Sequence, residues 1–405
     1  MKRRDFHKSA LSLGACSLAA TQSHTIHGAN DRVRIAILGC GVRGSSHISD
    51  LLRLQDPAVE ISHVCDVWSR AREQAAARIE NNKGKAPAAV SNYEEVLSSS
   101  EVDAVIIATP DFQHARMLRE AAEAGKDAYC EKPMATDLKE AVAAVDAVRE
   151  HKRVVQVGTQ WRSDPHFVAC AKAIQSGVLG RITRIAIAQN FHEPRWRKPY
   201  NDVQKQDVDW DRFQMHAPAH DFDPKRFKRW YLYQEYTNGL PGLWMSHFLN
   251  LVSWSMEELY PAGVTASGAV YLWGEDGRWT SDTFSAILDY PKGFQLNFAM
   301  SLCNSADTHC VFYGTNGKLD IWKRELSGDG GAGSDQIQES RILEPVPLNS
   351  HLENFIECIR SRKDPRCPVE YGLSHAVAGI MCAESIRTNR RLSFDPGRRE
   401  IIYDL

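Results

Sequence analysis

A glycine-rich turn near the N-terminus constrains this chain more than any other feature. The run Val33–Leu38 is short and β-branched, the sequence Gly39-Cys-Gly-Val-Arg-Gly44 follows at once, and a helical stretch comes next. A strand that enters a helix through G-x-G-x-x-G is typical of a dinucleotide-binding unit. The pattern predicts a tight turn at Gly39, close backbone approach to a pyrophosphate at Gly41, and close helix–strand packing at Gly44.

The next strand supplies an acidic residue where such a site needs one. Residues 59–65 form the second expected strand, and Asp66 ends it. A carboxylate at this position binds the adenosine ribose hydroxyls and repels a 2′-phosphate. NAD is therefore favoured over NADP, although Arg70 lies close enough to weaken that preference. A glycine turn in an unrelated α/β protein is the alternative interpretation.

Strands and helices then alternate through the rest of an expected first domain, residues 30–157. Such alternation predicts a doubly wound parallel sheet, whose ligands bind beyond the carboxyl ends of the strands. Further strands are expected at 102–108, 128–130 and 154–157, and helices at 45–54, 114–124 and 138–150. The residues at the glycine turn and just past strand ends are expected to line one cofactor crevice: Gly39, Gly41, Val42, Arg43, Gly44, Asp66, Thr109, Pro110, His114, Glu131, Lys132 and Gln160.

Consecutive strands followed by helices characterise the remainder, residues 158–405. This order predicts a second domain of the α+β class, and its C-terminal helices could pack back on the first domain. Strands are expected at 182–189, 264–273, 282–289, 295–303 and 309–313, and helices around 249–256, 351–360 and 373–388.

Residues 1–29 have the pattern of an export signal, so we do not expect them to be part of the fold. A basic head with Arg3-Arg4, then Phe6 and Lys8, precedes a weakly apolar, small-residue stretch. This pattern is typical of a twin-arginine signal, so we expect the twin-arginine machinery as a partner and the periplasm as the destination. An N-terminal tail without a targeting role is the alternative, as is lipid anchoring at Cys16.

Composition argues against several other classes. Of 405 residues, 49 are Lys or Arg and 51 are Asp or Glu, so no nucleic-acid partner is expected. Ten cysteines show no C-x-x-C spacing, and no metal is expected. His216 and His220 could suggest a metal pair, but Pro218 and Pro224 predict a loop there. The basic run 225–230 is expected to be a solvated loop.

Several motifs together resemble the glucose–fructose oxidoreductase, inositol dehydrogenase and MocA family, hereafter Gfo/Idh/MocA. They are GCGVRG at 39–44 with Asp66, IIATPDFQH at 106–114, AGKDAYCEKP at 124–133 and VVQVGTQWRS at 154–163. The resemblance implies a Rossmann domain, a second domain with an open, mostly antiparallel sheet, and a homodimer or homotetramer.

The resemblance also implies catalytic roles for two residues. Lys132 matches the lysine that positions or deprotonates a substrate hydroxyl, and His247 matches a histidine on the second domain's first long helix. Family dehydrogenases often carry an Asp four residues before that histidine, where this chain has Leu243. A related branch of NAD-dependent glycosidases lacks this Asp and has an aromatic residue where Trp244 stands. The expected function is thus an NAD-dependent oxidoreductase acting on a sugar; an NAD-dependent glycosidase and a non-catalytic NAD-binding protein remain alternatives.

Aromatic, Arg and His residues crowd the middle of the chain. Flat aromatic faces suit the C–H face of a sugar, and polar neighbours suit its hydroxyls. The same residues could instead fill a core or a subunit interface. Because an exported protein meets little free NAD, the cofactor is expected to be tightly bound. The expected substrate-binding residues are Trp161, Arg162, His192, Trp196, Arg197, Trp244 and His247.

Overall fold

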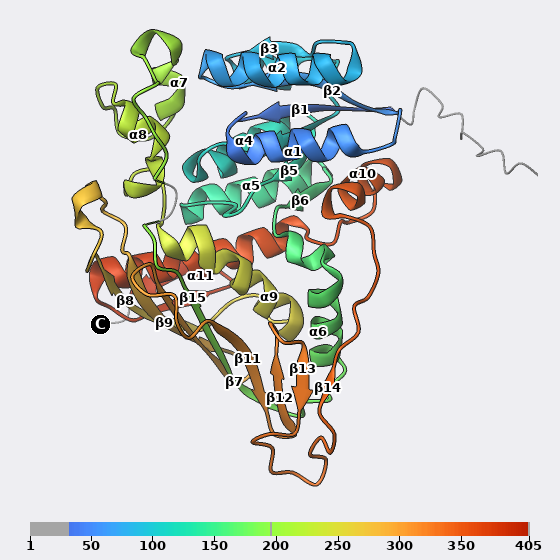
Figure 1. The fold of residues 1–405 in the computed structure, drawn as a ribbon, viewed down its shortest axis with the longest axis vertical. Coiled ribbons are helices and arrows are strands. Elements are labelled where there is room, and N and C mark those ends of the chain that lie inside the picture. Colours follow the sequence, from blue (N-terminus) through green and yellow to red (C-terminus); the bar gives the residue numbers. More distant parts are fainter. Residues whose placement is uncertain (1–31, 195–196, 404–405) are drawn as a thin grey trace, which may run out of the picture.

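The first domain is a parallel sheet with helices on both faces. The computed structural model describes residues 32–194 and 197–403, so the signal segment, Cys16 and Trp196 lie outside the described residues. Its elements are β1 Val33–Leu38, α1 Val42–Arg53, β2 Val59–Cys65, α2 Ser69–Lys83, β3 Ala88–Val90, α3 Tyr93–Ser98, β4 Ala104–Ile107, α4 His114–Glu123, β5 Asp127–Cys130, α5 Leu138–Glu150 and β6 Val155–Val157. The strand order is β3-β2-β1-β4-β5-β6, every pairing is parallel, and the expected doubly wound sheet is confirmed (Figure 1).

Continuous apolar runs explain why these strands lie inside. β4 and β5 are buried at every residue, as expected for parallel strands that are covered on both faces. The pairing of Ile107 with Cys130 aligns the carboxyl ends of β4 and β5. The polar residues that follow these two strands are therefore delivered to one edge of the sheet.

The second domain is built on a mixed, mostly antiparallel sheet. Among the described residues it contains ten strands in the order β14-β13-β12-β11-β7-β10-β9-β8-β15-β16, with a single parallel pairing, between β7 and β10. The strands are β7 Ile182–Asn190, β8 Gly263–Ala269, β9 Thr283–Tyr290, β10 Phe294–Ser301, β11 His309–Gly314, β12 Gly317–Asp320, β13 Glu325–Ser327, β14 Arg341–Ile342, β15 Leu392–Asp395 and β16 Glu400–Tyr403. This confirms the expected fold class.

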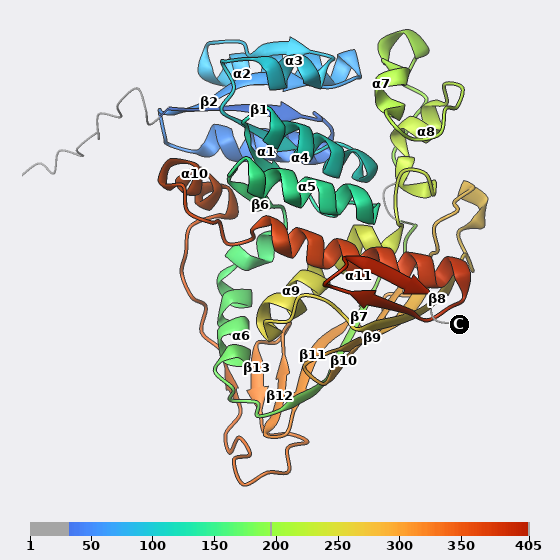
Figure 2. The same ribbon diagram turned by 180° about the vertical axis from the view of Figure 1, so that it is seen from behind.

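Helices separate this sheet from the first domain. α9, Ser246–Met256, and α11, Val369–Thr388, lie between the second sheet and the Rossmann domain, and α6, Pro165–Gln175, packs beside α9 (Figures 1 and 2). α10, His351–Ser361, contributes Phe355 to the apolar core of the first domain. None of the described helices is both long and apolar enough to span a membrane.

One expected strand is shorter than its sequence pattern suggested. β8 ends at Ala269, whereas the pattern predicted strand up to residue 273. The backbone N–H groups of Tyr271, Leu272 and Trp273 donate instead to the carboxylate of Asp282, at 2.9–3.1 Å. A side-chain acceptor has therefore replaced the neighbouring strand as the partner of this backbone.

The connection from β7 to α9 crosses over to the first domain, and we call residues 197–239 the cap segment. It contains α7, Trp210–Gln214, and α8, Pro224–Lys228, which lie beyond the carboxyl ends of the Rossmann strands (Figure 1). Phe213 packs edge-on against Phe112, and the Gln113 amide donates to the Phe213 carbonyl at 2.7 Å. The run 225–230 was expected to be a solvated loop; this is wrong, because residues 225–228 belong to α8 and Phe227 and Trp230 pack against the apolar cluster that contains Phe112 of the first domain.

Candidate active site

A cavity of about 930 Å³ lies where the Rossmann strand ends meet the cap segment and α9. Its base is the glycine turn. Gly39 has a φ of +90°, and a Cβ there would lie 2.7 Å from the Ala108 carbonyl oxygen. A Cβ at Gly44 would lie 1.8 Å from the Gly39 carbonyl oxygen, whereas one at Gly41 would meet nothing within 4 Å. The turn is therefore closed against protein on two sides and open to the cavity at Gly41.

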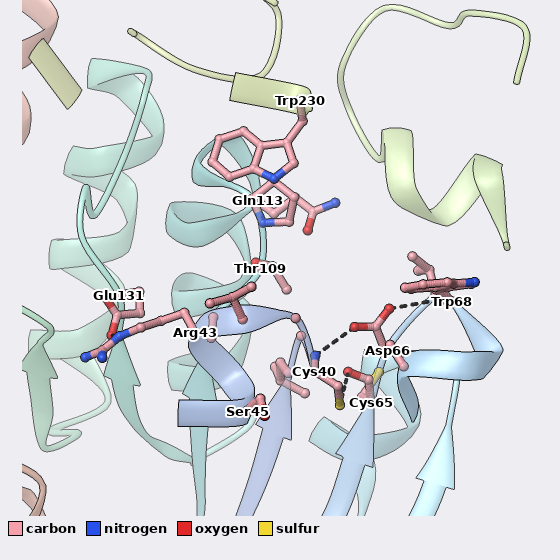
Figure 3. Close-up of a pocket in the computed structure, with 18 of the residues that line it drawn as sticks. Cys40, Arg43, Ser45, Cys65, Asp66, Trp68, Thr109, Gln113, Glu131 and Trp230 are labelled. Atoms are coloured by element: carbon pink, nitrogen blue, oxygen red, sulfur yellow. Dashed lines mark hydrogen bonds and ion pairs between the residues drawn. The ribbon is translucent and has the colours of Figure 1, made fainter. Parts of the chain in front are cut away.

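Asp66 fastens this turn to the end of β2. One carboxylate oxygen accepts the Cys40 N–H at 2.7 Å, and the other accepts the Trp68 N–H at 2.9 Å (Figure 3). Burial raises the pKa of Asp66, although these two backbone donors act in the opposite direction. The acidic residue predicted for the ribose thus lines the cavity beside the turn.

Glu131 joins β5 to α1 through two donors. Its Oε1 lies 2.5 Å from Arg43 Nε and 2.7 Å from His47 Nε2 (Figure 3 shows the Arg43 side chain reaching toward Glu131). Burial alone would raise the pKa of Glu131, but the His47 hydrogen bond and the Arg43 charge outweigh burial and lower it. Glu131 is therefore a carboxylate whose charge is already balanced by Arg43.

The side chain of Lys132 reaches toward the second domain. Its Nζ donates to the Leu243 carbonyl at 2.6 Å. Leu243 belongs to a π-helical turn, Pro241–Met245, that leads directly into α9. Burial lowers the pKa of Lys132, while the nearby carboxylates Asp111 and Glu131 partly offset that change. The lysine is thus held at the junction of the two domains with an amine of reduced basicity.

His247, in the first turn of α9, lies close to Lys132. Burial and the charge of Lys132 both lower the pKa of His247, so its imidazole is neutral at ordinary pH. The ring lies 5.0 Å from that of Trp161 and 6.3 Å from that of Trp244. Its Nδ1 is buried and has no hydrogen-bond partner among the described residues. A ligand with a hydroxyl group could satisfy such a ring.

The cap segment brings cations and aromatic rings to the end of the cavity that lies beside Asp66 and Trp68. We call this the adenosine end, because Asp66 is the acid predicted to bind the adenosine ribose. Lys228 Nζ lies 4.1 Å from the centroid of the Trp68 ring, and Lys198, Trp230 and Tyr231 line the same cavity. Figure 3 shows Trp230 above Thr109 and Gln113, on the side opposite the glycine turn. Burial lowers the pKa of both Lys198 and Lys228.

The structure brings the expected cofactor residues together. Gly44 alone does not line the cavity, because it packs under the turn against Gly39. The others line it: Gly39, Gly41, Val42, Arg43, Asp66, Thr109, Pro110, His114, Glu131, Lys132 and Gln160. Leu243, the departure from the family pattern, lines it too.

The expected substrate residues are dispersed, and of those described only His247 lines the cavity. Trp161 and Trp244 lie behind it as ring neighbours of His247. Arg162 is 6% exposed, with its guanidinium 3.7 Å from the centroid of the Tyr371 ring.

The two remaining described residues of that set, His192 and Arg197, lie outside the cavity lining. His192 is exposed and pairs with Cys303, and Arg197 bonds Glu275 at 2.8 Å.

Sequence reasoning missed several cavity residues. Trp68 stands two positions after the ribose acid, and Asp111 directly follows the Thr109-Pro110 pair. Their positions just past strand ends were a usable signal. No sequence signal pointed to the cap residues of the cavity, because only the path of the cap segment places them here. These residues are Lys198, Lys228 and Trp230.

These residues fit a dinucleotide. An open Gly41 backbone at a helix N-terminus that has no side-chain cap suits a pyrophosphate, and Asp66 suits a ribose. The fold and the site thus define a two-domain protein of the Rossmann dehydrogenase type.

Comparison with known proteins places the chain more closely. The family model described as an oxidoreductase family with an NAD-binding Rossmann fold matches residues 33–159, and the model of that family's C-terminal α/β domain matches residues 171–394. The chain therefore belongs to the Gfo/Idh/MocA family, and its first domain is an NAD-binding Rossmann domain.

Individual relatives are similar over part of their length. An uncharacterised oxidoreductase, YrbE of Bacillus subtilis, is 30% identical over 197 residues, which are 47% of this chain and 52% of that protein. Inositol 2-dehydrogenase of Rhizobium meliloti is 32% identical over 155 residues, 38% of this chain and 44% of that protein. A glycosyl hydrolase family 109 protein of Shewanella baltica is 29% identical over 171 residues, 41% of this chain and 37% of that protein. The matched stretch thus spans about half of each relative or less.

The fold is shared over nearly the whole chain with solved structures. The WlbA dehydrogenase from Bordetella pertussis, solved with NADH and UDP-GlcNAcA, superposes with a TM-score of 0.67 at 20% identity, covering 90% of this chain and 99% of that one.

Proposed function

We propose that this protein is an NAD-dependent oxidoreductase that acts on a hydroxyl of a sugar or sugar derivative. The observation that carries the proposal is the shared cavity: the dinucleotide cradle, Lys132 and His247 all line it. The names of the relatives, inositol dehydrogenase among them, support a polyhydroxylated substrate.

In the proposed mechanism, Lys132 is the base. Burial lowers its pKa, which increases the fraction of neutral amine able to take a hydroxyl proton. The Leu243 carbonyl holds Nζ in place by accepting a hydrogen bond from one of its N–H groups. Neutral His247 would accept or donate one hydrogen bond to the substrate and orient the reacting carbon. The bound nicotinamide supplies the hydride acceptor.

We further propose that the cofactor is held tightly and that the protein is exported. The cap segment supplies part of the lining of the adenosine end of the cavity, and residues 1–29 carry the twin-arginine pattern. A periplasmic enzyme that retains its cofactor needs a redox-neutral cycle, in which one sugar is oxidised and another is reduced. A homodimer or homotetramer, as the family resemblance implies, completes this proposal.

An NAD-dependent glycosidase is the second candidate. Leu243 supplies no carboxylate to pair with His247, and a glycosyl hydrolase family 109 protein is among the relatives. In such an enzyme the sugar is oxidised, loses its aglycone, gains water and is reduced again. A non-catalytic NAD-binding protein is the third.

One set of measurements separates the three. The purified protein is denatured to release and quantify nicotinamide, and the native protein is then mixed with sugars and glycosides while cofactor absorbance and products are recorded. An oxidoreductase gives a keto-sugar, a glycosidase gives free aglycone without net reduced cofactor, and a binding protein gives neither. Protein without nicotinamide would overturn tight binding.

Two variants test the base. Lys132→Ala is expected to abolish turnover, and Lys139→Ala, on the exposed face of α5, is the matched control that should leave it unchanged. Full activity of Lys132→Ala would remove the assignment.

A further inference from the structure

A buried ammonium group needs a counter-charge, and the neighbours of Lys132 leave one candidate. The Leu243 carbonyl, which accepts a hydrogen bond from Lys132, carries no formal charge. Glu131 is nearby, but Arg43 and His47 already bond its carboxylate. The carboxyl group that remains at this end of the cavity is Asp111.

Asp111 is placed by the same strand pairing that places Lys132. It follows β4, and Lys132 follows β5, whose ends are aligned by the Ile107–Cys130 pairing. Asp111 is 3% exposed and lines the cavity. The two groups therefore face one space from adjacent strand ends.

The second domain fixes Asp111 through a single hydroxyl. Thr237 of the cap segment donates from Oγ1 to Asp111 Oδ2 at 2.9 Å, and the same Oγ1 accepts the Gly239 N–H at 3.1 Å. Since the Thr237 proton is committed to Asp111, the oxygen that receives it is an acceptor in either charge state of the acid.

We propose that Asp111 is the proton partner of Lys132, a positioning residue that balances the lysine's charge and takes from it the proton that Lys132 removes from the substrate hydroxyl. This inference rests on the proposed function. The substrate O–H bond breaks as a Lys132 N–H bond forms; that N–H bond then breaks as an Asp111 O–H bond forms. The hydride from the adjacent carbon goes to the acceptor named above, so the sugar is oxidised and charge balances.

The electrostatics favour such an exchange. Burial raises the pKa of Asp111 to about 7, against the charge of Lys132 and the Thr237 hydrogen bond, and burial lowers the pKa of Lys132 toward it. Two groups whose pKa values approach each other pass a proton at little cost. The other titratable groups facing the pair are Glu131, Arg43, His114, His247 and His375.

The test is Asp111→Asn in the full-length purified protein. Competitive acetylation of Lys132, followed by peptide mass spectrometry across a pH series, reports the pKa of the amine without needing turnover. Loss of an adjacent carboxylate should lower the pKa of Lys132 by about one unit or more, and the rising limb of the rate–pH profile should move to lower pH with it. Asp146→Asn, an exposed carboxylate on α5, is the control and should shift neither.

Two further variants guard against misfolding. Asp111→Glu keeps a carboxylate and should restore the wild-type titration of Lys132, while Thr237→Val keeps the charge and should leave that titration within a few tenths of a unit. Unchanged acetylation of Lys132 in Asp111→Asn would overturn the inference even if Lys132→Ala is inactive. Full activity of Lys132→Ala would instead remove the proposed function itself.

Discussion

Two glycines of the turn give a matched test of how the cofactor is held. Gly41 and Gly44 are three residues apart, yet an added methyl group would meet different surroundings. At Gly41 it meets no protein atom within 4 Å, and the backbone there, with φ −64° and ψ −161°, is one that alanine adopts. At Gly44 it lies 1.8 Å from the Gly39 carbonyl oxygen. Alanine at 41 should affect the ligand, and alanine at 44 should affect the fold.

The contacts set the magnitudes. At Gly44 the methyl group and the carbonyl must separate by at least 1.2 Å, from 1.8 to 3.0 Å, and Gly39 cannot yield because it is itself packed against Ala108. Overpacking of this kind costs about 3 kcal/mol, or about 6–12 °C in Tm. Gly41→Ala should change unfolding free energy by less than about 1 kcal/mol. A methyl group in the path of the pyrophosphate, at about 1–3 kcal/mol, weakens NAD binding about 5- to 150-fold.

Thermal unfolding with and without added NAD, together with the nicotinamide content of the purified protein, measures both effects. We expect Gly41→Ala to melt like wild type that has been stripped of its nicotinamide, to gain little from added NAD, and to purify with little nicotinamide. Gly44→Ala should melt early under every condition. Wild-type nicotinamide content in Gly41→Ala, or a wild-type Tm in Gly44→Ala, would refute this account of the turn.

Two further predictions concern the charges around the cavity. Glu131→Gln should lower the free energy of unfolding by about 2 kcal/mol at pH 7, because Arg43 and His47 lose a charged acceptor. Since the folded-state pKa of Glu131 is lowered, this stabilisation is complete above about pH 4.3 and declines below it, so denaturant titrations should show a smaller difference at pH 4. Lys228→Ala should release bound NAD about tenfold faster in a dilution assay, because a cation is lost from the adenosine end. Exposed Lys205→Ala, in the same cap segment, should release it at the wild-type rate, and equal rates in both variants would exclude a role for Lys228.

Local patterns were sufficient for the first domain. The β-branched run, the glycine spacing and the acid at residue 66 each depend on neighbours in sequence, and a parallel sheet converts strand order into a shared edge. The same rule predicts from the sequence that Thr109, Glu131 and Lys132 line one cavity, as they do. Asp111 also lies just past a strand end, but its role depends on Thr237, a partner 126 residues away in the sequence.

Composition was a weaker guide to the second domain. Aromatic and basic residues in the middle of the chain looked alike in sequence, yet they pack in different places. Arg162 is buried against Tyr371, whereas Lys228 reaches the cavity. What separates them is the path of the cap segment, which is set by long-range packing such as that of Phe213 on Phe112. No short-range periodicity in the sequence predicts such long-range packing.

The charges around the cavity explain how one site can suit two different ligands. At the junction of the domains, Arg43 balances Glu131 and Asp111 balances Lys132, so this end is close to neutral, which suits the uncharged sugar that we propose as substrate. At the adenosine end, the described neighbours of Lys198 and Lys228 form no ion pair with either amine. A dinucleotide brings two phosphate charges, and these lysines come from the second domain while the glycine turn comes from the first. A bound dinucleotide would then contact both domains, so the contacts of Phe112 and Gln113 with Phe213 of the cap segment should also contribute to cofactor retention.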